Sequence, residues 1–190
     1  MARPIALLGG TFDPPHIGHL VLGECVGRQF DCERVIYMPA GNPYRKSGVR
    51  DVTPGAMRLE MTRLAIAGNP RFALDDREVR RSGPTYTVET LRELRDEGHD
   101  EILLVLGSDA VAQLPEWRES DEIRRLARIV VAEKNPGADT GGYPRVDMPL
   151  LPISSTIVRE RVRAGLPIRY LVVDAVNEYI VANKLYRDSE

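Results

Sequence analysis

Residue types that carry several common kinds of protein chemistry are scarce in this sequence. Its 190 residues include two cysteines, three histidines and one tryptophan. Cys25 and Cys32 lie on or beside one expected helix, and no second cluster of Cys or His stands at the spacing of a metal site. We therefore expect neither a disulfide framework nor a zinc site, and interpret both cysteines as packing residues.

Long apolar runs and a strong net charge are lacking as well. No apolar run reaches the roughly 18 residues that a membrane-spanning helix needs, and a glycine-rich loop follows the first apolar run too early for a signal peptide. A formal net charge of −2 argues against a broad basic surface that could hold nucleic acid. We expect a cytoplasmic protein that binds small molecules, with no membrane or nucleic-acid partner. The sequence leaves homo-oligomerisation open.

The sequence does contain a series of short apolar runs separated by amphipathic segments. With 43% hydrophobic residues, the chain suits one core, and we expect a single domain over residues 1–190. Apolar runs without polar alternation are typical of a parallel sheet covered by helices on both faces. We predict an α/β fold with a doubly wound, Rossmann-like parallel sheet. The expected strands are 5–8, 35–38, 72–74, 102–106 and 129–132, with a short extended stretch at 148–153.

Helix starts follow from capping residues and apolar periodicity. One helix should begin after His16 and another at the Ser154 to Thr156 hydroxyls. Three more helices should have hydroxyl or carboxylate N-caps, which we expect to be Thr53, Thr87 and Asp174.

The most informative segment is GGTFDPPHIGH at residues 9–19, between the first strand and the first helix. Glycines let the backbone approach a ligand, and the free N–H groups and dipole of a helix start favour an anion. His16 and His19 are three positions apart, so both rings can donate to the oxygens of one phosphate. The segment therefore predicts a phosphate site.

Simpler interpretations of this segment exist. A glycine-rich turn alone is a weak signal, and two histidines at this spacing could be a metal pair or surface residues. A metal pair needs a third ligand, yet the sequence has neither an HExxH motif nor a cysteine cluster. The whole string, in its context of strand, loop and helix, favours phosphate.

A second segment, ISSTIVR at residues 153–159, stands at the start of a later helix. Its hydroxyls can cap the helix, and Arg159 lies one turn after Ser155, where a guanidinium can bind phosphate oxygens. By itself the segment would more simply be a capped helix with a solvated arginine. Its presence together with the first segment favours a shared phosphate site.

Together the two segments resemble the nucleotidylyltransferase superfamily that carries the HxGH motif. Further segments resemble the bacterial nicotinate mononucleotide adenylyltransferases; these are residues 42–46, 84–91, 107–109, Trp117 and residues 179–186. The resemblance covers nearly the whole chain. It implies transfer of the adenylyl group of ATP to nicotinate mononucleotide, giving nicotinate adenine dinucleotide and pyrophosphate in the NAD pathway. It also implies Mg²⁺ with ATP and no tightly bound organic cofactor.

The same resemblance assigns roles to individual residues but no metal ligand. The residues expected to act on the reacting phosphates are His16, His19, Lys46 and Arg159. Those expected to bind ATP are Gly9, Gly10, Thr11, Phe12, Gly107, Asp109, Ser154, Ser155 and Thr156. Those expected to hold the pyridine mononucleotide are Thr85, Tyr86, Thr87 and Trp117.

Other interpretations of three of these residues stay open. Trp117 offers a flat face to a pyridine ring, and it could equally be an anchor in the core or in a lid. Asp109 could be the N-cap of the next helix. Lys46 could be an ordinary solvated lysine.

The residue types suit this reaction. The attacking group would be the phosphate of the mononucleotide, which is mostly ionised at neutral pH because its second pKa is about 6. No general base is needed, so catalysis should rest on positioning and on positive charge at the leaving pyrophosphate. Two rivals remain: a related transferase acting on phosphopantetheine or another phosphate, and a nucleotide-sensing module that has lost the reaction.

Overall fold

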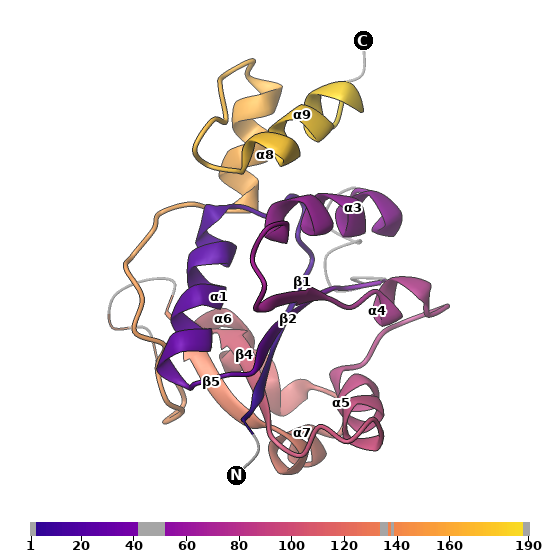
Figure 1. The fold of residues 1–190 in the computed structure, drawn as a ribbon, viewed down its shortest axis with the longest axis vertical. Helices are drawn as coiled ribbons and strands as arrows, with labels where there is room; N and C mark the ends of the chain where they lie inside the picture. The colour runs from indigo at the N-terminus through magenta and orange to yellow at the C-terminus, as the bar shows by residue number, and fades with distance from the viewer. Residues whose placement is uncertain (1–2, 42–51, 134–136, 138, 188–190) are drawn as a thin grey trace.

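A five-stranded parallel sheet forms the centre of the computed structural model, which describes residues 3–41, 52–133, 137 and 139–187 (Figure 1). The strands are β1 (Ile5–Gly10), β2 (Arg34–Pro39), β3 (Phe72–Leu74), β4 (Ile102–Gly107) and β5 (Arg128–Ala132). Their order is β3-β2-β1-β4-β5, and every neighbouring pair is parallel. The predicted doubly wound parallel sheet is therefore confirmed, with the strand order reversing at β1.

Helices make up most of the connections between strands. They are α1 (Ile17–Gln29), α3 (Gly55–Ile66), α4 (Arg77–Arg80), α5 (Thr87–Asp96), α6 (Ser108–Gln113), α7 (Ser120–Leu126), α8 (Ser155–Arg163) and α9 (Asp174–Ala182), with a 3-10 turn η1 (Leu114–Glu116). In the described part of the chain, none of these helices has both the length and the apolar character that a membrane crossing requires.

Both faces of the sheet are apolar because successive strand residues point to opposite sides. One face, with Leu7, Leu104 and Val131, packs against α5, η1 and α7. The other face, with Leu8 and Val105, packs against α1. This burial on two sides explains why the strands lack polar alternation.

A third apolar cluster joins α3 to the last two helices. Met61 of α3 packs with Val158 of α8 and with Val176 and Ile180 of α9, and all four side chains are buried. In Figure 1 these three helices gather at the end of the molecule opposite the N-terminus. The cluster thereby places the start of α8 beside the carboxyl end of β1.

The structure corrects several predicted helix starts. The N-caps of α3, α5 and α9 are Pro54, Tyr86 and Val173, each one residue away from the predicted caps Thr53, Thr87 and Asp174. The carbonyl of an N-cap residue normally accepts the first hydrogen bond of its helix, but the Thr53 carbonyl accepts from Nε of Arg58 at 2.8 Å, and the first turn donates to Pro54 instead. Asp174 is instead the first helical residue, where its charge still meets the positive end of the helix dipole.

Some elements carry too weak a pattern to be predicted. Helix α4 has four residues and no buried one, and Ile123 is the buried residue of α7. Residues 148–153 form no strand.

Candidate active site

The site lies at the carboxyl end of β1, where the strand order reverses and where α/β sheets bind ligands. Residues 11–16 connect β1 to α1 and are called the β1–α1 loop. The start of α8 lies against this loop, so two helix N-termini meet there. A cavity of about 460 Å³ opens between them.

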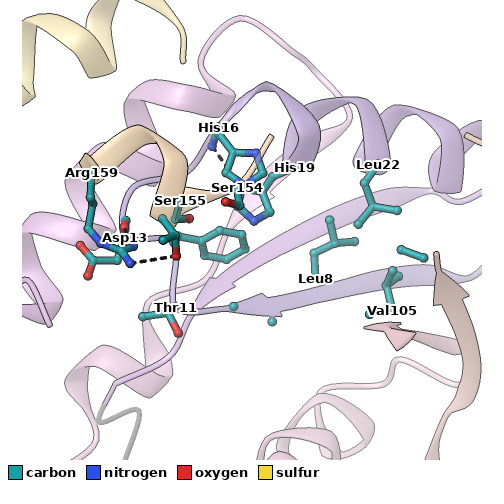
Figure 2. Close-up of a pocket in the computed structure, with 16 residues that line it drawn as sticks. Leu8, Thr11, Asp13, His16, His19, Leu22, Val105, Ser154, Ser155 and Arg159 are labelled. Carbon is teal, nitrogen blue, oxygen red and sulfur yellow. Dashed lines mark hydrogen bonds between the residues drawn. The ribbon is translucent and has the colours of Figure 1, made fainter. Parts of the chain in front are cut away.

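Most of the residues predicted to bind ATP or to act on its phosphates line this one cavity (Figure 2). They are Gly9, Gly10, Thr11, Phe12, His16, His19, Gly107, Ser154, Ser155, Thr156 and Arg159. In Figure 2 the two histidines lie next to each other, and Arg159 lies near Asp13. The two segments singled out in the sequence thus converge on a single site.

The other predicted residues that the structure describes do not line this cavity. Asp109 is exposed on α6, and the N-cap of that helix is Gly107, so the capping interpretation of Asp109 is wrong. Lys46 lies outside the described residues. The other predicted residues that do not line it are Thr85, Tyr86, Thr87 and Trp117. Their proposed roles stay predictions.

The proposed pyridine residues lie around the start of α5 and after η1. Trp117 is half-buried against the core, and its Nε1 is buried without a hydrogen-bond partner in the described part of the chain. Tyr86 is the N-cap of α5, and the guanidinium of Arg118 lies 4.6 Å from its ring centroid. A buried indole N–H without an acceptor is costly, and a bound ligand could supply that acceptor.

The two histidines hold each other in place. Their rings stack with centroids 3.7 Å apart and planes at 28°. Phe12 contacts His19 edge to face, with ring centroids 5.0 Å apart. The backbone N–H of His16 donates to Nδ1 of His19 at 3.1 Å. Because Nδ1 accepts, the proton of a neutral His19 ring is on Nε2, which is then the ring's donor.

His16 is buried, with 8% of its surface exposed, and its Nδ1 has no hydrogen-bond partner among the described residues. Burial lowers the pKa of His16 to about 4. The ring is therefore neutral at pH 7 and adds no fixed positive charge to the cavity.

The turn from β1 into the loop depends on close contact between Gly10 and Phe12. A Cβ on Gly10 would come within 3.0 Å of Cζ of Phe12, so only glycine fits without a shift. Phe12 itself has a φ of +48°, which is costly for a residue with a bulky side chain. The buried Phe12 ring is thereby placed beneath His19.

Helix α8 is hydrogen-bonded directly to the β1–α1 loop. Oγ of Ser155 donates to the carbonyl of Pro14 at 2.8 Å, although 141 positions separate the two residues. Nη1 of Arg159 donates to the carbonyl of Asp13 at 2.8 Å. Oγ of Ser154 caps the helix by accepting from the N–H of Ile157 at 3.2 Å. The late segment is thus fixed beside the early one.

Positive potential at the cavity comes from three sources. The dipoles of α1 and α8 both present their N-terminal ends. Arg159 adds the one formal cation among the described residues that line the cavity. This arrangement suits a polyphosphate.

Asp13, to which the sequence pattern assigns no role, connects the β1–α1 loop to distant segments of the chain. Its side chain is buried, and Oδ1 accepts from the hydroxyl of Tyr186 at 2.7 Å while Oδ2 accepts from the Thr53 N–H. Burial, with a smaller effect of the Asp13 charge, raises the pKa of Tyr186 well above its usual range. The available signal was an acidic residue inside a segment predicted to bind phosphate, because a carboxylate repels phosphate and is better explained by hydrogen bonds within the loop.

The described residues do not include a set of side chains that could hold a metal ion by themselves. Within the described ranges, no group of three or more His, Cys, Asp or Glu side chains could hold a metal ion. Asp13 is the one carboxylate among the described residues of the cavity, and both of its oxygens already accept hydrogen bonds.

Comparisons with known proteins agree with this geometry. The Cytidylyltransferase-like family matches residues 7–161. Two curated relatives are named "Probable nicotinate-nucleotide adenylyltransferase". The relative from Leifsonia xyli is 44% identical over 195 residues, covering 98% of this chain and 96% of its own. The relative from Roseiflexus sp. is 45% identical over 199 residues, covering 98% and 99%.

A solved structure has the same fold. The Plasmodium falciparum nicotinic acid mononucleotide adenylyltransferase complexed with NaAD superimposes with a TM-score of 0.78, covering 97% of this chain and 98% of that one. At 18% identity this likeness concerns the fold. The family match and the two curated relatives carry the conclusion: the chain belongs to the Cytidylyltransferase-like family and, within it, to the nicotinate-nucleotide adenylyltransferases.

Proposed function

We propose that this chain is an enzyme that transfers the adenylyl group of ATP to nicotinate mononucleotide, releasing pyrophosphate and forming nicotinate adenine dinucleotide. The observation that carries the proposal is the meeting of two helix N-termini, with His19 and Arg159, around one cavity at the sheet's switch point. The curated relatives bear the name of this activity.

The chemistry is a single in-line displacement. A phosphate oxygen of the mononucleotide attacks the α-phosphorus of ATP, a new P–O bond forms, and the bond to the bridging oxygen of pyrophosphate breaks with inversion. The nucleophile is already ionised at neutral pH because the second pKa of a phosphate monoester is about 6.

In this proposal the protein binds and orients anions. His19 donates from Nε2 to a phosphate oxygen, beside the backbone of Gly10 and Thr11. Ser155, Thr156 and Arg159 receive the departing β- and γ-phosphates at the start of α8. Such preorganised donors are worth most where charge develops in the transition state.

Mg²⁺ enters this scheme as the ion of the ATP complex. Mg²⁺ commonly binds through phosphate oxygens and waters with few protein ligands, which agrees with the lack of a ligand cluster in the described residues. When bound, the ion would neutralise part of the phosphate charge.

The remaining predicted residues complete the two substrate sites. Gly107 and Asp109 would contact the adenosine ribose. The mononucleotide would be held at the residues Thr85, Tyr86, Thr87 and Trp117. Lys46, which is one of residues 42–51, would bind a phosphate group of the substrate. The acid rather than the amide is proposed because the curated relatives are named for nicotinate.

A panel of acceptors tests the function. The protein is incubated with ATP, Mg²⁺ and nicotinate mononucleotide, nicotinamide mononucleotide or phosphopantetheine at equal concentrations, and products are separated by chromatography. Nicotinate adenine dinucleotide should form fastest. Preferred turnover of phosphopantetheine would favour the related transferase, and ATP binding without pyrophosphate release for any acceptor would favour a sensing module.

A further inference from the structure

Arg58 of α3 is an arginine buried inside the molecule. Only 1% of its surface is exposed, and it is among the largest fully buried side chains. A buried guanidinium must have acceptors for its donors, because leaving them unpaired costs several kcal/mol, roughly. The role of Arg58 therefore depends on which groups accept its hydrogen bonds.

Three backbone carbonyls accept from Arg58, and they belong to three different segments. Nη1 donates to Thr11 at 2.8 Å, Nη2 to Gly41 at 2.9 Å, and Nε to Thr53 at 2.8 Å. Thr11 is in the β1–α1 loop, Gly41 follows β2, and Thr53 precedes α3. One rigid guanidinium therefore joins the β1–α1 loop to the two segments that flank residues 42–51.

The bond to Thr11 fixes the orientation of a peptide group at the cavity. A trans peptide is planar, so when the Thr11 carbonyl points toward Arg58 the following N–H, that of Phe12, points away from it. Phe12 has a φ of +48° and its ring contacts His19. A backbone in this costly conformation persists only where its surroundings hold it. The guanidinium thus acts on the conformation of Phe12 and, through its ring, on His19.

We propose that Arg58 is a positioning residue for the adenylyl transfer, which holds the Thr11–Phe12 peptide and hence His19 in the orientation that receives ATP phosphates. This inference rests on the proposed function. Lysine should not replace it, because a single ammonium nitrogen cannot reproduce a planar fork that reaches three separate carbonyls.

The test compares R58K and R58Q with the matched control R63K. Arg63 lies on the same helix, but it is exposed and pairs with Glu60. For each protein one would measure thermal unfolding, kcat, KM for both substrates, and the Kd of an ATP analogue with a methylene group in place of the α,β-bridging oxygen. In folded R58K the Kd of the analogue should rise, and kcat should fall, by tenfold or more, roughly. R63K should match the wild type.

A merely structural role would lower the unfolding temperature and leave kcat, KM and Kd of the folded protein unchanged, which would overturn the inference. If both variants fail to fold, the wild-type protein is titrated with the analogue and followed by NMR. The signal of the Arg58 Nε–H should then shift, and that of Arg63 should not. No shift at Arg58 would also overturn it. Failure of the proposed function is distinguishable, because the wild type would then transfer nothing to any acceptor.

Discussion

At the scale of single residues, the three histidines of the chain allow a matched test of the site. His19 lines the cavity between Phe12 and His16, whereas His99 lies in the connection between α5 and β4. H19A removes the proposed phosphate donor, so kcat/KM should fall by 100-fold or more, roughly, as for other preorganised donors. H99A should keep the wild-type rate.

Both proteins should be checked for folding by circular dichroism before the rates are compared. A folded H19A with wild-type kcat/KM would show that this ring does not bind the reacting phosphates. A matching loss in H99A would instead point to a general effect of losing a histidine.

The pKa of His16 makes stability depend on pH. Burial lowers this pKa from 6.5 to about 4, so between these values the unfolded chain binds a proton that the folded protein does not. His16 therefore leaves the free energy of unfolding unchanged above pH 6.5. As the pH falls toward 4, the proton bound by the unfolded chain lowers this free energy by about 3 kcal/mol. In H16N, which keeps a good N-cap residue, this loss should vanish. Urea unfolding of both proteins at pH 7 and pH 4.5 measures the difference; equal pH dependence would contradict the burial argument.

Cavity residues at helix starts could be predicted from the sequence, whereas residues that support the loop could not. His16 and His19 lie at the start of α1, and Arg159 lies one turn after the start of α8. Helical spacing alone therefore places these side chains on the side of each helix that faces the cavity. The importance of Asp13 and Arg58 comes from partners far along the chain, such as Tyr186 and Thr11. No local pattern contains those contacts.

At the scale of elements, helix α8 depends on its N-cap. Oγ of Ser154 accepts from the N–H of Ile157, which satisfies one of the unpaired donors of the first turn. Ser154→Ala should lower the free energy of unfolding by about 1 kcal/mol. Because the same turn carries Ser155 and Thr156, binding of an ATP analogue should weaken too.

Ser154→Asn is the matched control, since asparagine caps as well as serine. Denaturant unfolding and calorimetric binding should place it near the wild type. If the alanine variant is as stable as the wild type, then the hydrogen bond to Ile157 contributes nothing to α8.

Strands and long helices were predictable because their apolar patterns are long. Ile102 to Gly107 is a continuous apolar run, and it forms the buried strand β4. The exact helix starts were less predictable, because Thr53 has the capping chemistry but its carbonyl accepts from Arg58 and not from the first turn of α3. Tertiary contacts thus overrode a local preference.

At the scale of the whole molecule, the site depends on segments from both ends of the chain. The doubly wound parallel sheet could be predicted from its apolar strands, and the rule that such sheets bind ligands where the strand order reverses locates the cavity at the end of β1. What it does not give is the packing of α3 against α8 and α9, which rests on scattered apolar residues such as Met61 and Ile180. That packing also brings the C-terminal segment to the β1–α1 loop.

Tyr186 makes this long-range link directly. Its hydroxyl donates to Oδ1 of the buried Asp13 at 2.7 Å, across 173 positions of sequence. Y186F keeps the ring and removes the donor, leaving a buried carboxylate with one hydrogen bond fewer. The free energy of unfolding should fall by about 2 kcal/mol, the usual range for a hydrogen bond to a charged group.

Y170F is the control, because Tyr170 is 81% exposed and its hydroxyl can be replaced by water without loss. Urea unfolding gives the stabilities, and titration with an ATP analogue shows whether the loop also loosens at the cavity. Since Asp13 is held by Tyr186 and its carbonyl receives Arg159, the analogue should bind more weakly to Y186F and equally well to Y170F. If Y186F loses stability but keeps full affinity, the C-terminal segment stabilises the fold without setting the geometry of the loop. If Y186F keeps both the stability and the affinity of the wild type, the hydrogen bond between Tyr186 and Asp13 contributes nothing to the free energy of unfolding.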